Sequence, residues 1–482
     1  IRRNFSSGTQ DCASKFAASE AVFGSSTIHP IPDIDNTDFL LIFGANPRVS
    51  HMSFISIADP MASLRAASKR GADIRFVDPR YNESIKGIGT HVSVKPDTDV
   101  YLMAAILHHL FDKGMVNHEY IQDHADHIEG LRSFISEYSP EQVASVVGIS
   151  AQSIAALGDD IGAAKSAAFY MSTGVNMGRQ GSLAYWLLFM LSVVTGNLDK
   201  PGGNVYSRGF YPAAKSGRIQ GDVKYEPTPL GDVRKIRGSL PGNLMADMIL
   251  SEDNPIKGLI VISGNPILSM GSGEKLQRAL EQLEFVMVID IYPSATSEYA
   301  DYLLPATDMF ERADINICGL GMQKEPFIQY TNFIVPPKAE RRPEWWILRQ
   351  LELAQGFATE NRELDDYQGA IDELGLFSRF DHMLRQSNLS INDVKSSGTV
   401  VLESVAPGKF FSNVIQTESS RVDCMPASFD EAIGRCREIF NELGREPRNQ
   451  LKMISRRTNY MINSWFHNVP SLKRPKHQNN PL

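Results

Sequence analysis

Two turns in the sequence have residue types suited to holding a ligand: GANP at positions 44–47 and SGNP at positions 263–266. Each follows an apolar run, and each proline can open a helix. If the run is a strand, the turn places backbone N–H groups and an asparagine side chain at the carboxyl edge of a sheet, where open α/β folds bind ligands. A Gly-Asn-Pro turn also occurs as a plain tight turn, but two copies in the same setting favour nucleotide-like ligands.

Acidic residues stand at two further points where a nucleotide can be recognised. VDPR at 77–80 ends an apolar run, and Asp78 can accept hydrogen bonds from a ribose or a guanine edge. The alternative is a capping aspartate paired with a nearby arginine. KPDTD at 95–99 has the same two interpretations, because Asp97 and Thr98 are also good helix caps. The sequence has neither GxGxxG nor GxxxxGK[ST], which disfavours a simple NAD or ATP site.

Cys12 lies in a polar loop ahead of a segment of small residues, ASKFAAS. A soft thiolate in such a loop can bind a transition metal, and an inert thiol is the alternative. The chain has 4 cysteines, none in a CxxC pair, which disfavours a disulfide framework or a zinc or iron–sulfur site built from this chain alone. The histidines between 118 and 127 stand among acidic residues, a pattern typical of a solvated helix face.

Short apolar runs that alternate with helical patterns predict the elements that hold these residues. We expect strands at 39–43, 74–77, 167–171, 259–262 and 285–289. One helix begins at Asp59-Pro60 and ends at Gly71, and a second begins near Asp97 or Thr98 and ends at Gly114. This alternation predicts an α/β fold with two Rossmann-like parallel-sheet units, each covered by helices on both faces and related by pseudo-symmetry.

Composition narrows the class of protein. The 482 residues include 48 Lys and Arg against 56 Asp and Glu, a net charge of −8, so we expect no binding to nucleic acid. The longest apolar run, at 184–194, is shorter than the ~20 residues that span a bilayer and predicts a buried helix.

Arg2-Arg3 is followed by polar residues rather than an apolar stretch, which argues against an export signal. We expect a soluble fragment of a longer polypeptide, cytoplasmic or periplasmic, its compartment unknown.

Taken in order, these segments resemble the molybdopterin-dependent oxidoreductases of the DMSO reductase family. The segments are GANPRVSH (44–51), VDPR (77–80), KPDTD (95–99), STGVNMGRQG (172–181), TGNLDKPGGN (195–204), SGNP (263–266) and EYADYLLPATDMFER (298–312). RRTNYMINSWFHN (456–468) resembles the start of that family's C-terminal barrel domain. Several motifs in the family's order are far more specific than any one of them.

The resemblance implies one molybdenum or tungsten held by the dithiolene sulfurs of two molybdopterin guanine dinucleotides, one for each α/β unit. The metal would exchange an oxygen atom or a hydride equivalent with a small-molecule substrate, and an electron-transfer subunit or acceptor would take up the electrons. The family commonly carries a [4Fe–4S] cluster on an N-terminal segment, which we expect to precede residue 1 in the longer polypeptide. No direct membrane span is expected.

The same resemblance assigns roles to individual residues. By position Cys12 is the metal ligand, and Asp11 is the alternative if the alignment shifts by one residue. Arg208 resembles the arginine that orients an anion, and Asn176 is expected to be both catalytic and cofactor-binding. The other residues expected to bind the cofactor are Gly44, Ala45, Asn46, Pro47, His51, Asp78, Arg80, Asp97, Asp99, Gly174, Gly264, Asn265, Pro266, Asp290 and Thr296.

We place the first α/β unit, with the metal-ligand loop, at 1–210 and the second at 211–350. A peripheral helical or mixed segment follows at 351–450, and the start of the barrel domain at 451–482. Formate dehydrogenases of the family have a histidine after the metal ligand, whereas Ala13 follows Cys12 in this sequence, which argues against formate as the substrate. The competing functions are a non-catalytic scaffold, like the large iron–sulfur subunit of respiratory complex I, and a hydratase on the same cofactor. Cys12 and the paired turns favour an enzyme over a scaffold.

Overall fold

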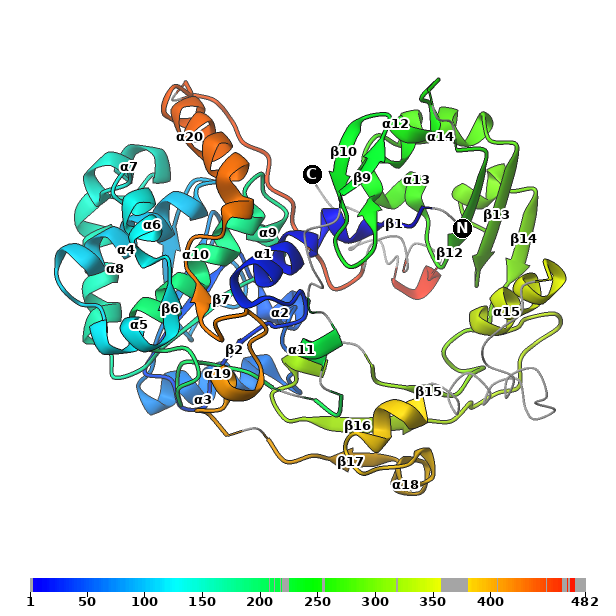
Figure 1. Ribbon diagram of the computed structural model, residues 1–482, viewed down its shortest axis with the longest axis horizontal. Coiled ribbons are helices and arrows are strands. Elements are labelled where there is room, and N and C mark those ends of the chain that lie inside the picture. The colour runs from blue at the N-terminus through cyan, green and yellow to red at the C-terminus, as the bar shows by residue number, and fades with distance from the viewer. Residues whose placement is uncertain are drawn as a thin grey trace.

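The computed structural model describes residues 3–207, 209–211, 213–216, 218, 225–253, 256–317, 320–356, 380–404, 406–447, 449–461, 466 and 469–472. Figure 1 shows two sheet-containing halves, with the first α/β unit on the left and the second on the right. Strands β15 to β17 lie along the lower edge between them, and helix α1 lies near the centre.

The first unit is built on a parallel four-stranded sheet in the order β5-β4-β3-β7. The strands are β3 (Phe39–Phe43), β4 (Asp73–Asp78), β5 (Thr90–Ser93) and β7 (Ala167–Met171). The sequence predicted three of the four. All of their carboxyl ends meet at one edge of the sheet, because parallel strands run in the same direction.

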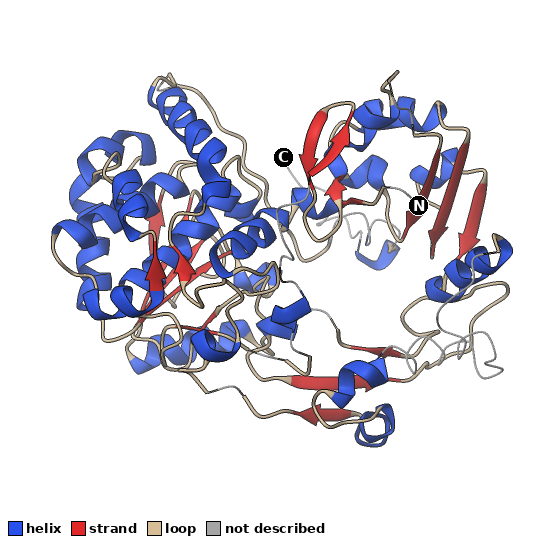
Figure 2. Ribbon diagram, in the orientation of Figure 1, coloured by secondary structure: helices blue, strands red, loops and turns tan. Residues whose placement is uncertain are grey.

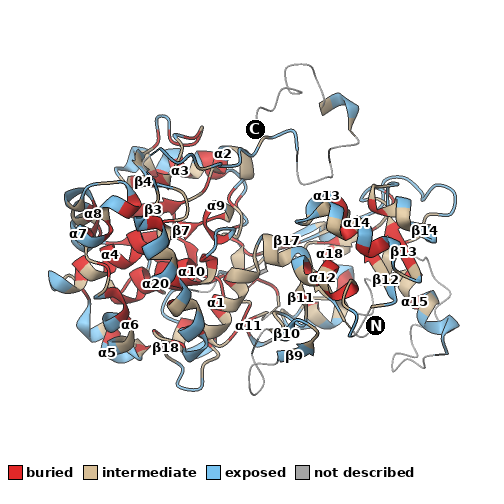
Figure 3. Cartoon of the chain, turned by 90° about the horizontal axis from the view of Figure 1, so that it is seen from above, coloured by how far each residue is buried: buried red, intermediate tan, exposed pale blue. Residues whose placement is uncertain are grey.

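Helices cover both faces of this sheet, as the apolar runs predicted (Figure 2). Phe39, Leu41 and Phe43 pack in one core cluster with α4 (Asp99–Asp112) and α10 (Gly181–Val194). Leu40 and Ile42 point to the opposite face, where they pack against α3 (Pro60–Arg70). Figure 3 shows the buried residues concentrated around β3, β4, β7, α4 and α10.

The helix ends follow the predicted signals. The Asp59 carboxylate accepts a hydrogen bond from the Ala62 amide at 2.9 Å, and Gly71 ends α3 in a left-handed conformation. Thr98 immediately precedes α4. Helices α5 (His118–His124), α6 (Ile128–Ile135), α7 (Pro140–Val147) and α8 (Ala151–Ala163) follow α4 in this unit. Within the described ranges no group of three or more His, Cys, Asp or Glu side chains is arranged to hold a metal ion.

The second unit is built on a parallel three-stranded sheet in the order β12-β13-β14. The strands are β12 (Gly258–Ile262), β13 (Phe285–Asp290) and β14 (Tyr302–Pro305). Helices α12 (Met245–Ile249), α13 (Pro266–Ser269) and α14 (Gly273–Glu281) share one apolar cluster beside this sheet. Ile289 and Ala306 pack in a separate cluster with Ile347 of α15 (Glu344–Ala354).

Later parts of the chain attach to two different places. Strands β15 (Asp314–Ile315), β16 (Phe327–Thr331) and β17 (Thr399–Val401) form an antiparallel sheet. That sheet packs with α18 (Ile391–Ser397). In contrast, α19 (Phe410–Asn413) and α20 (Asp430–Gly444) return to the first unit, where Phe410 and Cys436 belong to its large core cluster. The proposed boundaries at 210, 350 and 450 stay predictions.

The last part of the chain has little regular structure where it is described. Among the described residues after 450 there is the short helix η7 (Pro470–Leu472) and no strand. The start of a barrel domain at 451–482 therefore stays a prediction. Among the described helices, none combines the length and apolar character needed to cross a bilayer.

The amino-terminal segment joins the two halves. Strand β1 (Phe5–Ser6) pairs in parallel with β11 (Leu240–Pro241), which precedes the second sheet in the chain. After the short helix η1 (Ser7–Gln10), α1 (Ala13–Phe23) enters the first unit and buries Ala18, Val22 and Phe23 in its core. Cys12 lies at this crossing point.

The turn after β3 and the turn after β7 are in direct contact through two glycines. The Gly174 amide donates to the Gly44 carbonyl at 3.1 Å, and Gly44 has φ 53°, a conformation that favours glycine. A Cβ on Gly174 would lie 2.6 Å from the Gly44 oxygen. In contrast, a Cβ on Gly264 in the second unit would meet nothing closer than 3.7 Å.

We therefore expect Gly174→Ala to lower the free energy of unfolding by about 1–3 kcal/mol, because the new methyl group overpacks a contact between two backbones. Gly264→Ala is the matched control and is expected to change it by less than about 0.5 kcal/mol. Chemical denaturation of both variants checks this. Equal effects of the two substitutions would contradict the packing role of Gly174.

Candidate cofactor and metal site

The turn that carries Cys12 is held against the carboxyl edge of the first sheet. The Cys12 amide donates to the Gly8 carbonyl at 2.7 Å, and Cys12 immediately precedes α1. The Asn176 side-chain amide, at the end of α9 (Thr173–Asn176), donates to the Asp11 carbonyl. The Ser14 hydroxyl donates back to the Asn176 carbonyl at 3.1 Å. The fold thus brings Asn176 to the Asp11-Cys12 turn, although 165 positions separate Asn176 from Asp11 in the sequence.

A buried lysine lies directly below this turn. Lys15 is 1% exposed, and its ammonium donates to the Met171 carbonyl at the end of β7 at 2.7 Å. The same nitrogen lies 4.3 Å from the centre of the Phe54 ring and 5.1 Å from that of Tyr185. Burial lowers the pKa of Lys15 to about 7, although the negative charge of Asp11 and of a Cys12 thiolate acts in the opposite direction.

Burial also controls Cys12 itself. Its side chain is half-buried, and burial together with the charge of Asp11 raises the pKa of the thiol to about 11, against the opposing charges of Lys15 and Arg237. A thiol in this setting stays protonated unless a stronger positive charge is supplied. A bound metal ion supplies such a charge, because coordination deprotonates a thiol outright.

Two buried polar atoms suggest room for a polar ligand at the sheet edges. The side-chain oxygen of Asn176, which follows β7, finds no hydrogen-bond partner in the described part of the chain, and neither does the hydroxyl of Thr307, which follows β14. Asn176 is 5% exposed and Thr307 1% exposed. Buried polar groups are nearly always paired, so an unpaired one at the carboxyl edge of each sheet fits a missing partner such as a dinucleotide.

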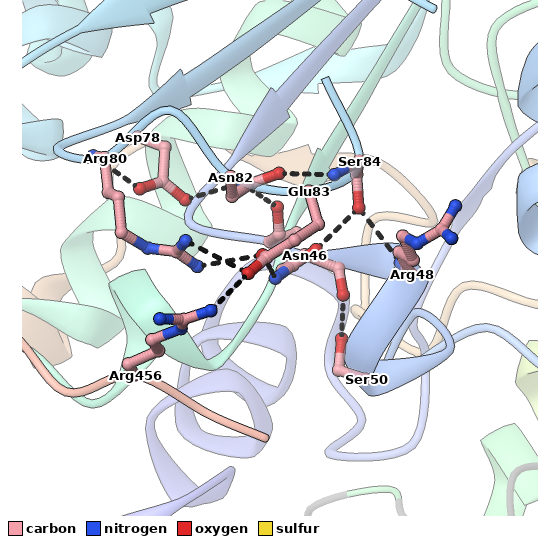
Figure 4. Close-up of polar contacts among 10 residues, drawn as sticks. Asn46, Arg48, Ser50, Asp78, Arg80, Asn82, Glu83, Ser84 and Arg456 are labelled. Atoms are coloured by element: carbon pink, nitrogen blue, oxygen red, sulfur yellow. Dashed lines mark hydrogen bonds and ion pairs between the residues drawn. The ribbon is translucent and has the colours of Figure 1, made fainter. Parts of the chain in front are cut away.

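The first asparagine turn is part of a connected polar network (Figure 4). The Asn46 side-chain amide donates to Glu83 at 2.7 Å, and Ser84 donates to the Asn46 side-chain oxygen at 2.7 Å. Arg80 and Arg456 form ion pairs with Glu83 at 3.2 and 3.1 Å. Partial burial acts to raise the pKa of Glu83, but hydrogen bonds from its own amide, Arg80 and Asn46 outweigh it and hold the pKa at about 2. Glu83 is therefore a fixed negative charge beside Asn46.

Asp78 and Ala45 belong to the same network. The Asp78 carboxylate accepts hydrogen bonds from the Arg80 backbone amide at 2.8 Å and from the Asn82 side chain at 3.0 Å. Asn82 also donates to the Ala45 carbonyl at 3.0 Å. Asp78 thus caps the turn after β4, and its contact is with the backbone of Arg80 rather than with its guanidinium. The cofactor-binding role of these residues stays a prediction.

The KPDTD segment places two carboxylates at the start of α4. Asp97 has a left-handed backbone with φ 68° and forms an ion pair with Arg179 at 2.5 Å. Burial, with the charges of Asp97 and Asp78 nearby, raises the pKa of Asp99 to about 7. His51 ends α2 (Pro47–Ser50), and its Nε2 lies 2.9 Å from the Ile57 carbonyl oxygen.

The second asparagine turn has the same local geometry as the first. Asn46 has φ −125° and ψ 78°, Asn265 has φ −125° and ψ 71°, and each is followed by a proline that opens a short helix. Asn265 accepts hydrogen bonds from the backbone and hydroxyl of Thr296 at 3.3 and 2.8 Å. Asp290 ends β13 and accepts from two amides of the following turn, Ile291 at 2.7 Å and Tyr292 at 3.3 Å. The equivalence of the two turns supports the paired-unit hypothesis, and the pseudo-symmetry of the units stays a prediction.

Two outcomes concern Arg208 and the site residues that the sequence analysis did not single out. Arg208, the expected anion-binding arginine, lies outside the described residues. The sequence analysis did not single out Lys15 or Glu83. Lys15 donates to the Met171 carbonyl at the end of β7, and Glu83 accepts a hydrogen bond from Asn46. A lysine among the small residues that follow Cys12 was a visible signal for Lys15. Glu83 had no local signal, because its contact with Asn46 comes from the loop after the neighbouring strand.

The comparisons with known proteins agree with this geometry. A family model described as molybdopterin oxidoreductase matches residues 2–353. The chain is 25% identical over 384 residues to a nitrate reductase of Synechocystis, covering 75% of this chain and 52% of that protein. It is 25% identical over 361 residues to formate dehydrogenase H of Escherichia coli, covering 70% and 48%. The structure resembles acetylene hydratase from Pelobacter acetylenicus with a TM-score of 0.69 at 16% identity, covering 88% of this chain and 60% of that one.

The chain therefore belongs to the molybdopterin oxidoreductase family. This confirms the resemblance to the DMSO reductase type, whose members include nitrate reductases and formate dehydrogenases. The chain spans about half the length of the curated relatives it matches. The likeness to acetylene hydratase shows the fold alone, which is α/β with parallel sheets.

The buried lysine gives a pH prediction. In the unfolded chain Lys15 keeps its proton up to its ordinary pKa of 10.5, whereas in the folded protein it loses the proton above about pH 7. The unfolded state binds more protons between these values, so the free energy of unfolding rises with pH across this window. We expect Lys15→Met to be more stable than the wild type below pH 7, by roughly 2–4 kcal/mol, with the advantage shrinking toward pH 10.

Chemical denaturation at a series of pH values measures this difference. Lys113 is exposed, and Lys113→Met is the matched control, expected to show no such trend. A stability difference for Lys15→Met that does not change with pH would contradict the burial of a titrating amine.

Proposed function

We propose that this chain carries the metal-ligand loop and both dinucleotide sites of a molybdenum or tungsten oxidoreductase that acts on a small molecule. The observation that carries the proposal is the attachment of the Cys12 turn to the carboxyl edge of the first sheet through Asn176 and Ser14. Family membership supports the class of chemistry, and the named relatives reduce nitrate or oxidise formate. For the full-length enzyme, the proposal includes a [4Fe–4S] cluster and an electron-transfer partner.

Each side of the cofactor would be held by the carboxyl edge of one sheet. In the first unit the candidates are the Asn46 turn, Asp78, Asp99 and Asn176. In the second unit they are the Asn265 turn, Asp290 and Thr296. The acidic residues suit the amino and imino donors of a guanine base, and the backbone amides after Gly44 and Gly264 suit phosphate oxygens. When bound, the cofactor supplies a metal that exchanges two electrons with the substrate.

The residues of this chain have three tasks in that reaction. Cys12 provides the protein ligand and limits the number of open positions on the metal. Asn176 fixes the backbone of the ligand turn by its hydrogen bond to the Asp11 carbonyl. Lys15 places a titratable amine beneath the same turn, away from water, where it can hold or release a proton near neutral pH.

The cofactor assignment predicts that the full-length protein, produced in cells that make the cofactor, contains about one equivalent of molybdenum or tungsten and a guanine dinucleotide pterin. Elemental analysis and the fluorescence of the oxidised pterin measure both. A protein with neither would show that the fold serves as a scaffold rather than as an enzyme.

The ligand assignment predicts that Cys12→Ala abolishes turnover while most of the pterin stays bound, because the dinucleotide contacts lie on other elements. Asp11→Ala is the matched comparison and is expected to keep much of the activity, since Asp11 contacts Asn176 through its backbone carbonyl. Activity with a dye acceptor, together with pterin content, separates the two variants. An active Cys12→Ala beside an inactive Asp11→Ala would transfer the ligand role to Asp11.

A further inference from the structure

The segment between α9 and α10 contains an arginine that bridges two carboxylates. The Arg179 guanidinium donates to one oxygen of Asp97 at 2.5 Å, and the Arg179 backbone amide donates to the other at 3.3 Å. A second nitrogen of the same guanidinium donates to both oxygens of Glu442 on α20, at 3.1 and 3.0 Å. The Asp97 side chain is 22% exposed and that of Glu442 62%, so the Asp97 end of the bridge is the more shielded from water.

Asp97 lies at the edge of the first sheet where we expect a ligand. It follows β5, whose last residue, Ser93, is the register partner of Asp78 at the end of β4. Its backbone has φ 68°, in the left-handed region that aspartate tolerates better than most residues. A Cβ on Gly178 would lie 3.2 Å from an oxygen of the Asp97 carboxylate. The absence of a side chain at position 178 therefore lets this carboxylate lie close to the backbone of the Arg179 segment.

Two buried amide side chains in and beside the same segment are incompletely paired. The Gln180 side chain donates to the Tyr101 hydroxyl at 3.0 Å, and that hydroxyl donates to the Cys436 carbonyl of α20 at 2.8 Å. The side-chain oxygen of Gln180, like that of Asn176, has no hydrogen-bond partner among the residues that the structure describes. Gln180 is 9% exposed and Asn176 5% exposed. Unpaired buried oxygens on both sides of Arg179 in the sequence fit a polar partner that is missing from this region.

A guanidinium and the edge of a guanine base offer a carboxylate the same kind of donors. Guanine has an N–H and an amino group side by side, and a guanidinium presents its N–H groups in a similar planar fork. We propose that Arg179 occupies Asp97 in place of a guanine edge, so that a guanine ligand binds at Asp97 only after Arg179 has moved away. This inference rests on the proposed function, because it concerns how the dinucleotide reaches its site in the first unit.

Glu442 gives the displaced arginine a second partner. When a guanine edge takes the Asp97 carboxylate, the Arg179 guanidinium keeps its two bonds to Glu442 and is not left unpaired. The pair of Arg179 with Asp97 is then an autoinhibitory contact within the empty protein. It lowers the apparent affinity for guanine by the fraction of molecules in which Asp97 is free.

The test uses full-length protein produced without the pterin cofactor, with GMP as the ligand. Hydrogen exchange read by mass spectrometry follows the amides of residues 97–102 as GMP is added, and half-maximal protection gives the local affinity. We expect Arg179→Met to lower the half-maximal GMP concentration by about threefold or more, because it removes the competing ion pair. The loss of a positive charge by itself has the opposite effect on an anionic nucleotide, since it weakens long-range attraction.

Three controls accompany this measurement. AMP is the control for the base, because the corresponding ring nitrogen of adenine accepts rather than donates, and Arg179→Met is expected to leave the response to AMP unchanged. Arg437→Met is the matched control for charge, because it removes an arginine of α20 that pairs with Glu137 at 2.5 Å. It is expected to behave like the wild type. The amides of residues 285–296 report on the second unit in the same sample, and their response to GMP is expected to stay the same.

An unchanged or raised half-maximal GMP concentration in Arg179→Met overturns the proposal. The same holds for an equal change with AMP or in Arg437→Met, and for an absence of protection by GMP in every variant. Arg179→Gln is a second variant, expected to act in the same direction, so that a folding defect in one variant does not decide the result.

The metal and pterin content of the full-length protein tests the proposed function separately. If the protein contains both but its affinity for GMP does not respond to Arg179→Met, this inference alone is overturned. If the protein contains neither and Arg179→Met still tightens GMP binding, the proposed function is refuted and the autoinhibitory contact stands.

Discussion

The site depends on one junction, the set of hydrogen bonds that ties the first turn of α1 to the end of β7. Asn176 holds the Asp11 carbonyl, Ser14 holds the Asn176 carbonyl, and Lys15 holds the Met171 carbonyl. On the other side of this junction residues 5–6 pair with residues 240–241, and the Leu240 amide donates to the Asn4 carbonyl. Cys12 is therefore fixed between the two halves of the molecule, because its chain is anchored in both directions.

The two sheets contribute to this arrangement in different ways. In the first sheet the turns after β3 and β7 touch through Gly44 and Gly174. These two glycines are needed there because a side chain on Gly174 would collide with the backbone of the other turn. In the second sheet a Cβ on Gly264 would make only ordinary contacts, at 3.7 Å or more, and the polar contacts of its turn run through Asn265 and Thr296. The two similar turns therefore differ in how strictly their surroundings require glycine. A shared backbone conformation at Asn46 and Asn265 accompanies different hydrogen-bond partners, Glu83 and Ser84 in one unit and Thr296 in the other.

Several features that are unfavourable by themselves occur at or near the Cys12 turn. Lys15 is a fully buried amine without a carboxylate partner among the described residues, and Arg237 occupies a strained backbone position. The Cys12 thiol is held in its neutral form by burial and by Asp11. In other parts of the fold the capping residues and apolar runs of the sequence agree with the structure. Examples are the caps of α3 and the buried face of β3. Natural sequences depart from such consistency mainly where function requires it.

The sequence by itself determined the strands at 39–43, 74–77, 167–171, 259–262 and 285–289, the start of α3 at Asp59, and the family. These follow from local patterns, since apolar runs, caps and motif order are readable within a few residues. It also identified Cys12 and Asn176 as separate candidates. Only the tertiary structure bound Asn176 to Asp11 and Ser14, on either side of Cys12. It also buried Lys15 against the end of β7 and paired Asn46 with Glu83. Those contacts join residues that are far apart in the chain, and they depend on how the strands order in the sheet and how the halves meet, which no local pattern encodes.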